Sequence, residues 1–167
     1  MNLYVLRHAQ AAPLGDAVRR DADRLLTDKG VADATLAGVA LRRLDSAIAL
    51  LLCSPLRRAR QTAELVGAQF PASPEVRETE SLSPGFRPAD LVKELKTISP
   101  DGSVVVVGHQ PDLGRFISYV IEADPSASIE LSPAALAFIR FAADSTSEAS
   151  LRWLLTPEVL KILLSPR

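Results

Sequence analysis

The chain contains a single cysteine, Cys53, so no disulfide can form within it. Cys53 ends the apolar run AIALLLC, where we expect a buried, unreactive thiol, and a reducing compartment fits this composition. The 19 lysine and arginine residues are nearly balanced by 20 aspartate and glutamate residues. Because this near-zero net charge provides no broad basic surface, we expect neither a nucleic acid nor an anionic membrane as a partner.

Long apolar segments are also missing, since none approaches the roughly 20 residues needed to cross a bilayer. Arg7 and His8 interrupt the first apolar run, so the start of the chain does not resemble a signal peptide, and we expect a cytoplasmic protein. Two histidines and one cysteine are too few for a zinc site, and neither an EF-hand loop nor the motifs GxGxxG and GxxxxGK occur. We therefore expect no metal and no cofactor.

The length of 167 residues suits one hydrophobic core, so we expect a single domain over residues 1–167. Buried strands are predicted at residues 2–7, 47–53 and 103–108, with a short strand at 76–79. Strands at 134–141 and 151–155 are predicted to form a hairpin joined by the loop ADSTSE. No apolar stripe beyond the expected core demands a partner, which favours a monomer.

Helical patterns separate these strands. The first predicted helix has Thr27 as its N-cap and continues to about Leu44, with Leu36, Val39, Ala40 and Leu44 facing inward. The others begin at Ser54 and Pro55, near Pro88 with an end around Ser99, after His109 with Pro111 in the first turn, and at Pro157. The alternation predicts a three-layer α/β/α sandwich with a mostly parallel mixed sheet.

The only two histidines, His8 and His109, each directly follow a predicted strand, and a third strand leads into SPLRRARQT at residues 54–62. Because the carboxyl ends of parallel strands meet at one edge of a sheet, we expect these segments to converge. Histidine can attack phosphorus near neutral pH, and the arginine fork binds phosphate oxygens in pairs. With Arg7 beside His8, the pattern predicts an oxyanion site. Taken alone, the three arginines of residues 54–62 are more typical of a solvated helix face.

Three segments resemble motifs of the histidine phosphatase (phosphoglycerate mutase-like) superfamily: LRHA at 6–9, SPLRRARQT at 54–62 and VVVVGHQP at 104–111. The pattern SPxxRAxQT places Arg58, not Arg57, in the catalytic register. The short length, RLLTDKG at 24–30 and SPGFRPADL at 83–91 are similar to the SixA-type phosphohistidine phosphatases. The resemblance implies a phosphoglycerate mutase-like fold without a large inserted cap. Ala9 is a small departure, since many members have glycine there.

The resemblance further implies that neutral His8 attacks phosphorus in line, forming a phosphohistidine intermediate that water hydrolyses. Arg7, Arg58 and a protonated His109 are then expected to stabilise the charge on the phosphate oxygens. Arg24 is a candidate for a fourth contact with phosphate. An ion pair of Arg24 with a nearby carboxylate (Asp21, Asp23 or Asp28) is an equally good interpretation.

The general acid is left open, because larger relatives carry it in an inserted region that this chain is too short to contain. Glu78 and Glu80 are the nearest candidates, with Glu80 preferred, and exposed loop charges are the alternative interpretation. SixA-type proteins are thought to have no obvious counterpart. A missing acid suits a phosphorus–nitrogen substrate, because a protonated imidazole leaves readily without help.

The expected function is therefore metal-independent hydrolysis of phosphohistidine, with a phosphorylated protein as the partner. Two alternatives use the same residues. One is a phosphatase for small phosphate compounds such as sugar phosphates, which the short chain disfavours. The other is a catalytically silent phosphate-binding module, which the presence of His8 disfavours.

Overall fold

The computed structural model describes residues 1–15, 18–98, 102–123, 129–142 and 149–165. In this part of the chain, six strands form one mixed sheet in the order β3-β2-β4-β1-β5-β6. The strands are β1 (Asn2–Arg7), β2 (Leu50–Cys53), β3 (Glu75–Glu78), β4 (Ser103–Gly108), β5 (Leu136–Phe141) and β6 (Ala149–Leu155). The first four strands pair in parallel, whereas β5 pairs antiparallel with both β1 and β6. The predicted mostly parallel mixed sheet is confirmed.

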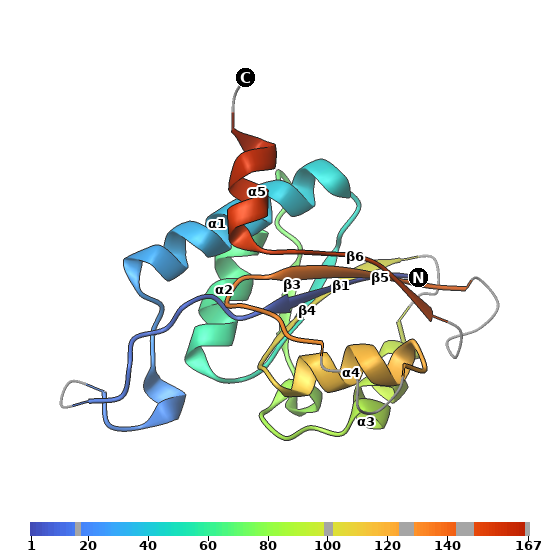
Figure 1. The fold of residues 1–167 in the computed structure, drawn as a ribbon, viewed down its shortest axis with the longest axis horizontal. Coiled ribbons are helices and arrows are strands. Elements are labelled where there is room, and N and C mark those ends of the chain that lie inside the picture. Colours follow the sequence, from blue (N-terminus) through green and yellow to red (C-terminus); the bar gives the residue numbers. More distant parts are fainter. Residues whose placement is uncertain (16–17, 99–101, 124–128, 143–148, 166–167) are drawn as a thin grey trace.

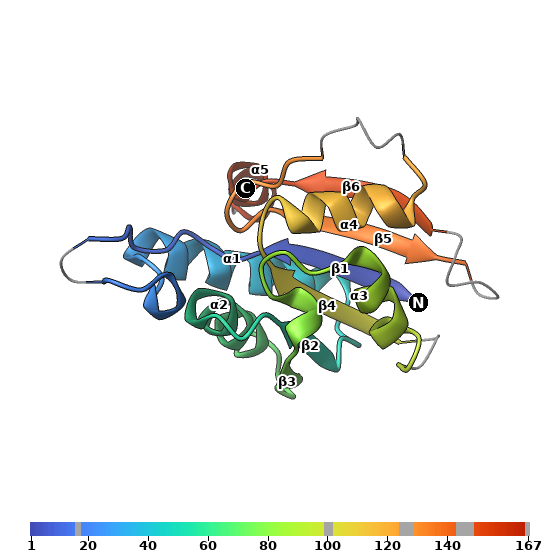
Figure 2. The same cartoon turned by 90° about the horizontal axis from the view of Figure 1, so that it is seen from below.

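Helices cover both faces of the sheet (Figures 1 and 2). They are α1 (Asp28–Leu44), α2 (Arg57–Gly67), α3 (Pro88–Leu95), α4 (Asp112–Val120) and α5 (Pro157–Leu164). Helices α1, α2 and α5 lie on one face, and α3 and α4 lie on the other. This arrangement is the predicted three-layer sandwich.

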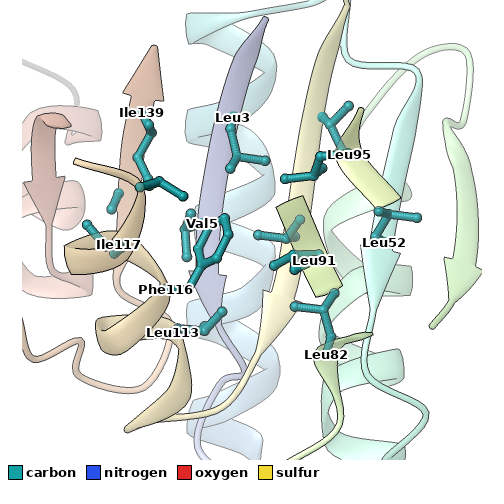
Figure 3. Packing of buried hydrophobic residues seen from close by; sticks show 14 of the residues in the cluster. Leu3, Val5, Leu52, Leu82, Leu91, Leu95, Leu113, Phe116, Ile117 and Ile139 are labelled. Carbon is teal, nitrogen blue, oxygen red and sulfur yellow. The ribbon is translucent and has the colours of Figure 1, made fainter. Parts of the chain in front are cut away.

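The alternation of side chains along β1 divides the core between the two faces. Leu3 and Val5 point toward α3 and α4, where they pack with Leu91 and Phe116 (Figure 3). Tyr4 and Leu6 belong to the cluster under α1 and α2. Burial on both faces explains why β1 and β4 are apolar almost throughout.

Helix α1 begins as predicted, because the Thr27 hydroxyl accepts a hydrogen bond from Gly30 N at 3.1 Å. The prediction of which α1 residues face inward was partly wrong. Leu44 is 53% exposed, and of the four residues expected to face inward only Ala40 is buried. Small residues form most of the buried face instead, with Leu41 and Asp33 as the exceptions. At the closest approach to α2 only a small residue fits: a Cβ at Gly38 would lie 2.9 Å from the Val66 carbonyl oxygen.

Helix α2 begins at Arg57, two residues after the predicted start. The Ser54 hydroxyl accepts a hydrogen bond from Leu56 N at 3.3 Å, so it closes the turn that precedes the helix. Strand β2 likewise begins at Leu50, later than predicted, and α3 ends at Leu95. Ser99, Asp16 and the predicted hairpin loop at 143–148 lie outside the described residues. None of the described helices is both long enough and apolar enough to span a membrane.

Candidate active site

Strand order brings three polar side chains together at one edge of the sheet. His8, Ser54 and His109 directly follow β1, β2 and β4, and β4 lies between the other two strands. The backbone continues the strand pairing into the site: His8 N donates to Gly108 O, and Ser54 N donates to Val107 O, both at 2.9 Å. The residue after β4 is therefore placed between the residues that follow its neighbours.

The His8 ring is held by its own chain, because Nδ1 lies 2.8 Å from the carbonyl oxygen of Ala9. A carbonyl can only accept, so Nδ1 carries the proton and Nε2 presents a lone pair. Nε2 accepts a hydrogen bond from Arg58 Nε at 3.2 Å. Burial, with a smaller effect of the Arg58 charge, lowers the pKa of His8 to about 4, so the ring is neutral near pH 7.

Arg58 lies in the first turn of α2 and is only 5% exposed. Besides His8, its guanidinium reaches His109 Nδ1 at 3.4 Å and thus links the two histidine rings. Thr62, one turn further along α2, ties this helix to the segment after β1. Its hydroxyl donates to Arg58 O at 2.7 Å and accepts from Ala9 N at 3.1 Å.

His109 lies beside His8, with the ring centroids 5.0 Å apart. Its Nε2 is 2.8 Å from the Ser54 hydroxyl, and because Arg58 can only donate, Nδ1 is the acceptor in the neutral ring. Burial, assisted by the charges of His8 and Arg58, lowers the pKa of His109 to about 3. The protein's own groups therefore disfavour the protonated His109 expected from the sequence. A dianionic phosphate is the charge that would stabilise the imidazolium.

Arg7 approaches the same cluster from the end of β1, and its charge lowers the pKa of both histidines. Its Nη1 donates to the Leu131 carbonyl at 2.7 Å. The Nε–H group is buried, and no acceptor for it lies among the described residues. A buried donor without an acceptor is costly, and an oxyanion within hydrogen-bond reach of this group would remove that cost.

Arg24 forms the ion pair that the sequence left as one of two interpretations. Its Nη1 lies 3.0 Å from Asp21 Oδ1, and its Nε donates to the Ala12 carbonyl at 2.6 Å. Glu80 is exposed and accepts a hydrogen bond from the Ser83 hydroxyl at 2.6 Å, while Glu78 pairs with Arg60. Within the described residues, no hydrogen bond or ion pair joins either glutamate to His8 or His109.

Sequence reasoning missed the contacts of three residues in this cluster. Ser54 was interpreted only as a helix cap, yet it also contacts His109. The sequence marks Thr62 only as a motif position and Asp21 only as a possible partner of Arg24. The fixed spacing of Ser54, Arg58 and Thr62 within SPxxRAxQT was the available signal. No group of three or more histidine, cysteine, aspartate or glutamate side chains suited to a metal ion occurs in the described parts of the chain.

Comparisons with known proteins identify the class. Residues 3–83 match the Histidine phosphatase superfamily (branch 1). An uncharacterized protein of Picosynechococcus sp. is 37% identical over 143 residues, which cover 84% of this chain and 85% of that protein. The chain belongs to the histidine phosphatase superfamily and is a phosphatase of that superfamily.

Its structure is SixA-like. The structure of the protein histidine phosphatase SixA complexed with tungstate superposes with a TM-score of 0.83 at 24% identity, covering 96% of this chain and 100% of that chain. A protein of Nakamurella multipartitia, proposed to be the phosphohistidine phosphatase SixA, gives a TM-score of 0.76 at 28% identity. That match covers 93% of this chain and 95% of the other.

Proposed function

We propose that this protein is a metal-independent phosphatase that removes phosphate from phosphohistidine on proteins, with His8 as the nucleophile. The observation that carries the proposal is the hydrogen bond from His8 Nδ1 to the Ala9 carbonyl at 2.8 Å. It directs the Nε2 lone pair toward Arg58, from which it accepts a hydrogen bond, within a cluster that also holds His109 and Arg7. A phosphate oxygen that took over this hydrogen bond from Arg58 would free the lone pair for attack. A neutral, oriented imidazole is the form that can attack phosphorus.

In the first step, His8 Nε2 forms a bond to phosphorus while the bond from phosphorus to the substrate nitrogen breaks. The electron pair of that bond leaves with the substrate ring, which departs as neutral imidazole if it entered protonated. In the second step, water attacks phosphorus, the bond to His8 breaks, and inorganic phosphate is released. Splitting the reaction in this way replaces one difficult displacement by two easier ones.

Arg7, Arg58 and His109 are proposed to stabilise the phosphate oxygens. The Arg7 Nε–H group, buried and without an acceptor in the described residues, supports this role. When His109 becomes protonated beside the phosphate, Nε2 continues to donate to Ser54, and Nδ1 becomes a second donor for an oxygen. Removal of one such donor typically costs on the order of 100-fold in rate.

The placement of Glu80 supports phosphohistidine over alkyl phosphate esters as the substrate. Its carboxylate is exposed and accepts a hydrogen bond from Ser83, and among the described residues no hydrogen bond joins it to His8, Arg58 or His109. An alkoxide leaving group needs a proton from a general acid, whereas a protonated imidazole does not. The cluster therefore suits a leaving group that brings its own proton.

The test is phosphate release from a histidine-phosphorylated protein and from a panel of sugar phosphates, with a chelator present. We expect release from phosphohistidine to be preferred and to be abolished in His8→Ala. Preference for sugar phosphates would instead indicate a small-ester phosphatase. Phosphate binding without turnover would indicate a silent binding module.

Covalent catalysis is tested separately with radiolabelled substrate, rapid denaturation and analysis at alkaline pH, where phosphohistidine survives. Label is expected on His8 in the wild type and is expected to be missing in His8→Ala. Label on another residue would refute the mechanism.

A further inference from the structure

Asp21 contacts two arginines of the site at once. Its Oδ2 lies 3.0 Å from Arg58 Nη2, and its Oδ1 lies 3.0 Å from Arg24 Nη1. The backbone carbonyl of Asp21 also accepts a hydrogen bond from Arg58 Nη1 at 2.8 Å. Asp21 therefore holds the outer edge of the Arg58 guanidinium through both its main chain and its carboxylate.

The donors of Arg58 are divided between the histidines and Asp21. Nε donates to His8, Nη1 donates to the Asp21 carbonyl, and Nη2 serves both His109 and the Asp21 carboxylate. A phosphoryl group beside His8 and His109 would take its oxygen contacts from the Nε and Nη2 edge. Nη2 carries two hydrogens, so it could donate to a phosphate oxygen and to Asp21 together, but the two anions would then share the single positive charge of Arg58.

We infer that Asp21 is a specificity-determining residue, whose carboxylate competes with bound phosphate for Arg58. By this competition it disfavours free dianionic phosphate relative to a phosphoryl group attached to a protonated imidazole. The inference rests on the proposed function, because it assigns the leaving group of that same site.

Charge and exposure both fit this role. The hydrogen bond from Arg24, together with the Arg58 charge, lowers the pKa of Asp21 below its usual value, so the carboxylate is ionised near pH 7. The Asp21 side chain is 49% exposed, whereas the Arg58 side chain is 7% exposed. Solvent can therefore reach the carboxylate, whereas the guanidinium is enclosed by the protein. A cationic leaving group offsets the repulsion that the fixed negative charge imposes on a dianion.

The experiment compares Asp21→Asn and Asp21→Ala with the wild type and with Asp23→Asn. Asp23 lies in the same turn, but its carboxylate pairs with the exposed Arg20, so its substitution is a matched control. Dissociation constants for inorganic phosphate are measured at pH 7 by calorimetry. We expect both Asp21 variants to bind phosphate about tenfold more tightly, because loss of a neighbouring like charge changes an equilibrium constant by about a factor of ten. Asp23→Asn is expected to stay within twofold of the wild type.

Weaker or unchanged phosphate affinity in both Asp21 variants would overturn the inference and indicate that Asp21 only positions Arg58. Selectivity is the second readout. The ratio of kcat/KM for a phosphohistidine peptide to kcat/KM for p-nitrophenyl phosphate, whose leaving group carries no cation, is expected to fall about tenfold in Asp21→Asn. An unchanged ratio would also overturn the inference.

Failure of the wild type to turn over phosphohistidine would refute the proposed function instead. In that case the phosphate affinities of the Asp21 variants still decide whether Asp21 competes for Arg58.

Discussion

Gly30, in the first turn of α1, packs directly against the backbone of the segment that carries the proposed nucleophile. A Cβ added to Gly30 would overlap the Gln10 carbonyl oxygen and lie 3.0 Å from its carbon. The same oxygen accepts hydrogen bonds from Thr27 N at 3.0 Å and from the Thr27 hydroxyl at 3.3 Å. Gly30→Ala must therefore separate α1 from residues 8–10.

The magnitude follows from two opposing effects. Overpacking against rigid backbone costs about 1–3 kcal/mol, and weakening the Thr27 hydrogen bonds adds about 1 kcal/mol. Replacing glycine by alanine in a helix returns at most about 1 kcal/mol. We expect Gly30→Ala to lower the free energy of unfolding by about 2 kcal/mol, measured by urea denaturation. Its kcat/KM is also expected to fall, because Gln10 is two residues from His8.

Gly67→Ala is the matched control, since it makes the same change in α2 at a site with room. The added Cβ would lie 3.7 Å from the nearest atom, which is ordinary contact distance. Its stability is expected to be unchanged or raised by up to about 1 kcal/mol. If Gly30→Ala is as stable and active as Gly67→Ala, the argument that backbone contact positions the His8 segment is wrong.

Three further predictions concern the site and the core. Ser54→Ala is expected to lower kcat/KM by about 10- to 100-fold, because the hydrogen bond to a charged His109 is worth about 1.5–3 kcal/mol; unchanged steady-state kinetics would contradict this. Burial lowers the pKa of His8 to about 4 and that of His109 to about 3, against 6.5 in an unfolded chain, so the unfolded state binds more protons between these values. The free energy of unfolding is therefore expected to fall as the pH drops from about 6.5 to about 4, and a flat profile in urea denaturation would contradict the burial argument. Burial also raises the pKa of Cys53 to about 12, so a thiol reagent is expected to label it only after unfolding, and rapid labelling of the native protein would count against a buried thiol.

Much of the fold could be predicted because its signals are local. Thr27 is a side-chain cap and Pro88 and Pro157 are favoured at the first turn of a helix, so three helix starts follow from neighbouring residues alone. Apolar runs mark β1 and β4 because both faces of these strands are buried. The inward face of α1 was less predictable, since it depends on how closely α2 approaches. Leu44 extends past that contact and is exposed, whereas Gly38 lies within it.

The candidate site likewise has features that the sequence predicts and features that it does not. The sequence by itself determined which residue types follow the strands, and these identified His8, Arg7, Arg58 and His109 as candidates. Only the tertiary structure decided what each side chain contacts, because those partners are far apart in the chain. Strand order places β4 between β1 and β2 and so brings Ser54 to His109, 55 residues away. The fold of the segment after β1 likewise brings Asp21 onto Arg58, 37 residues away, and no local sequence pattern encodes this contact.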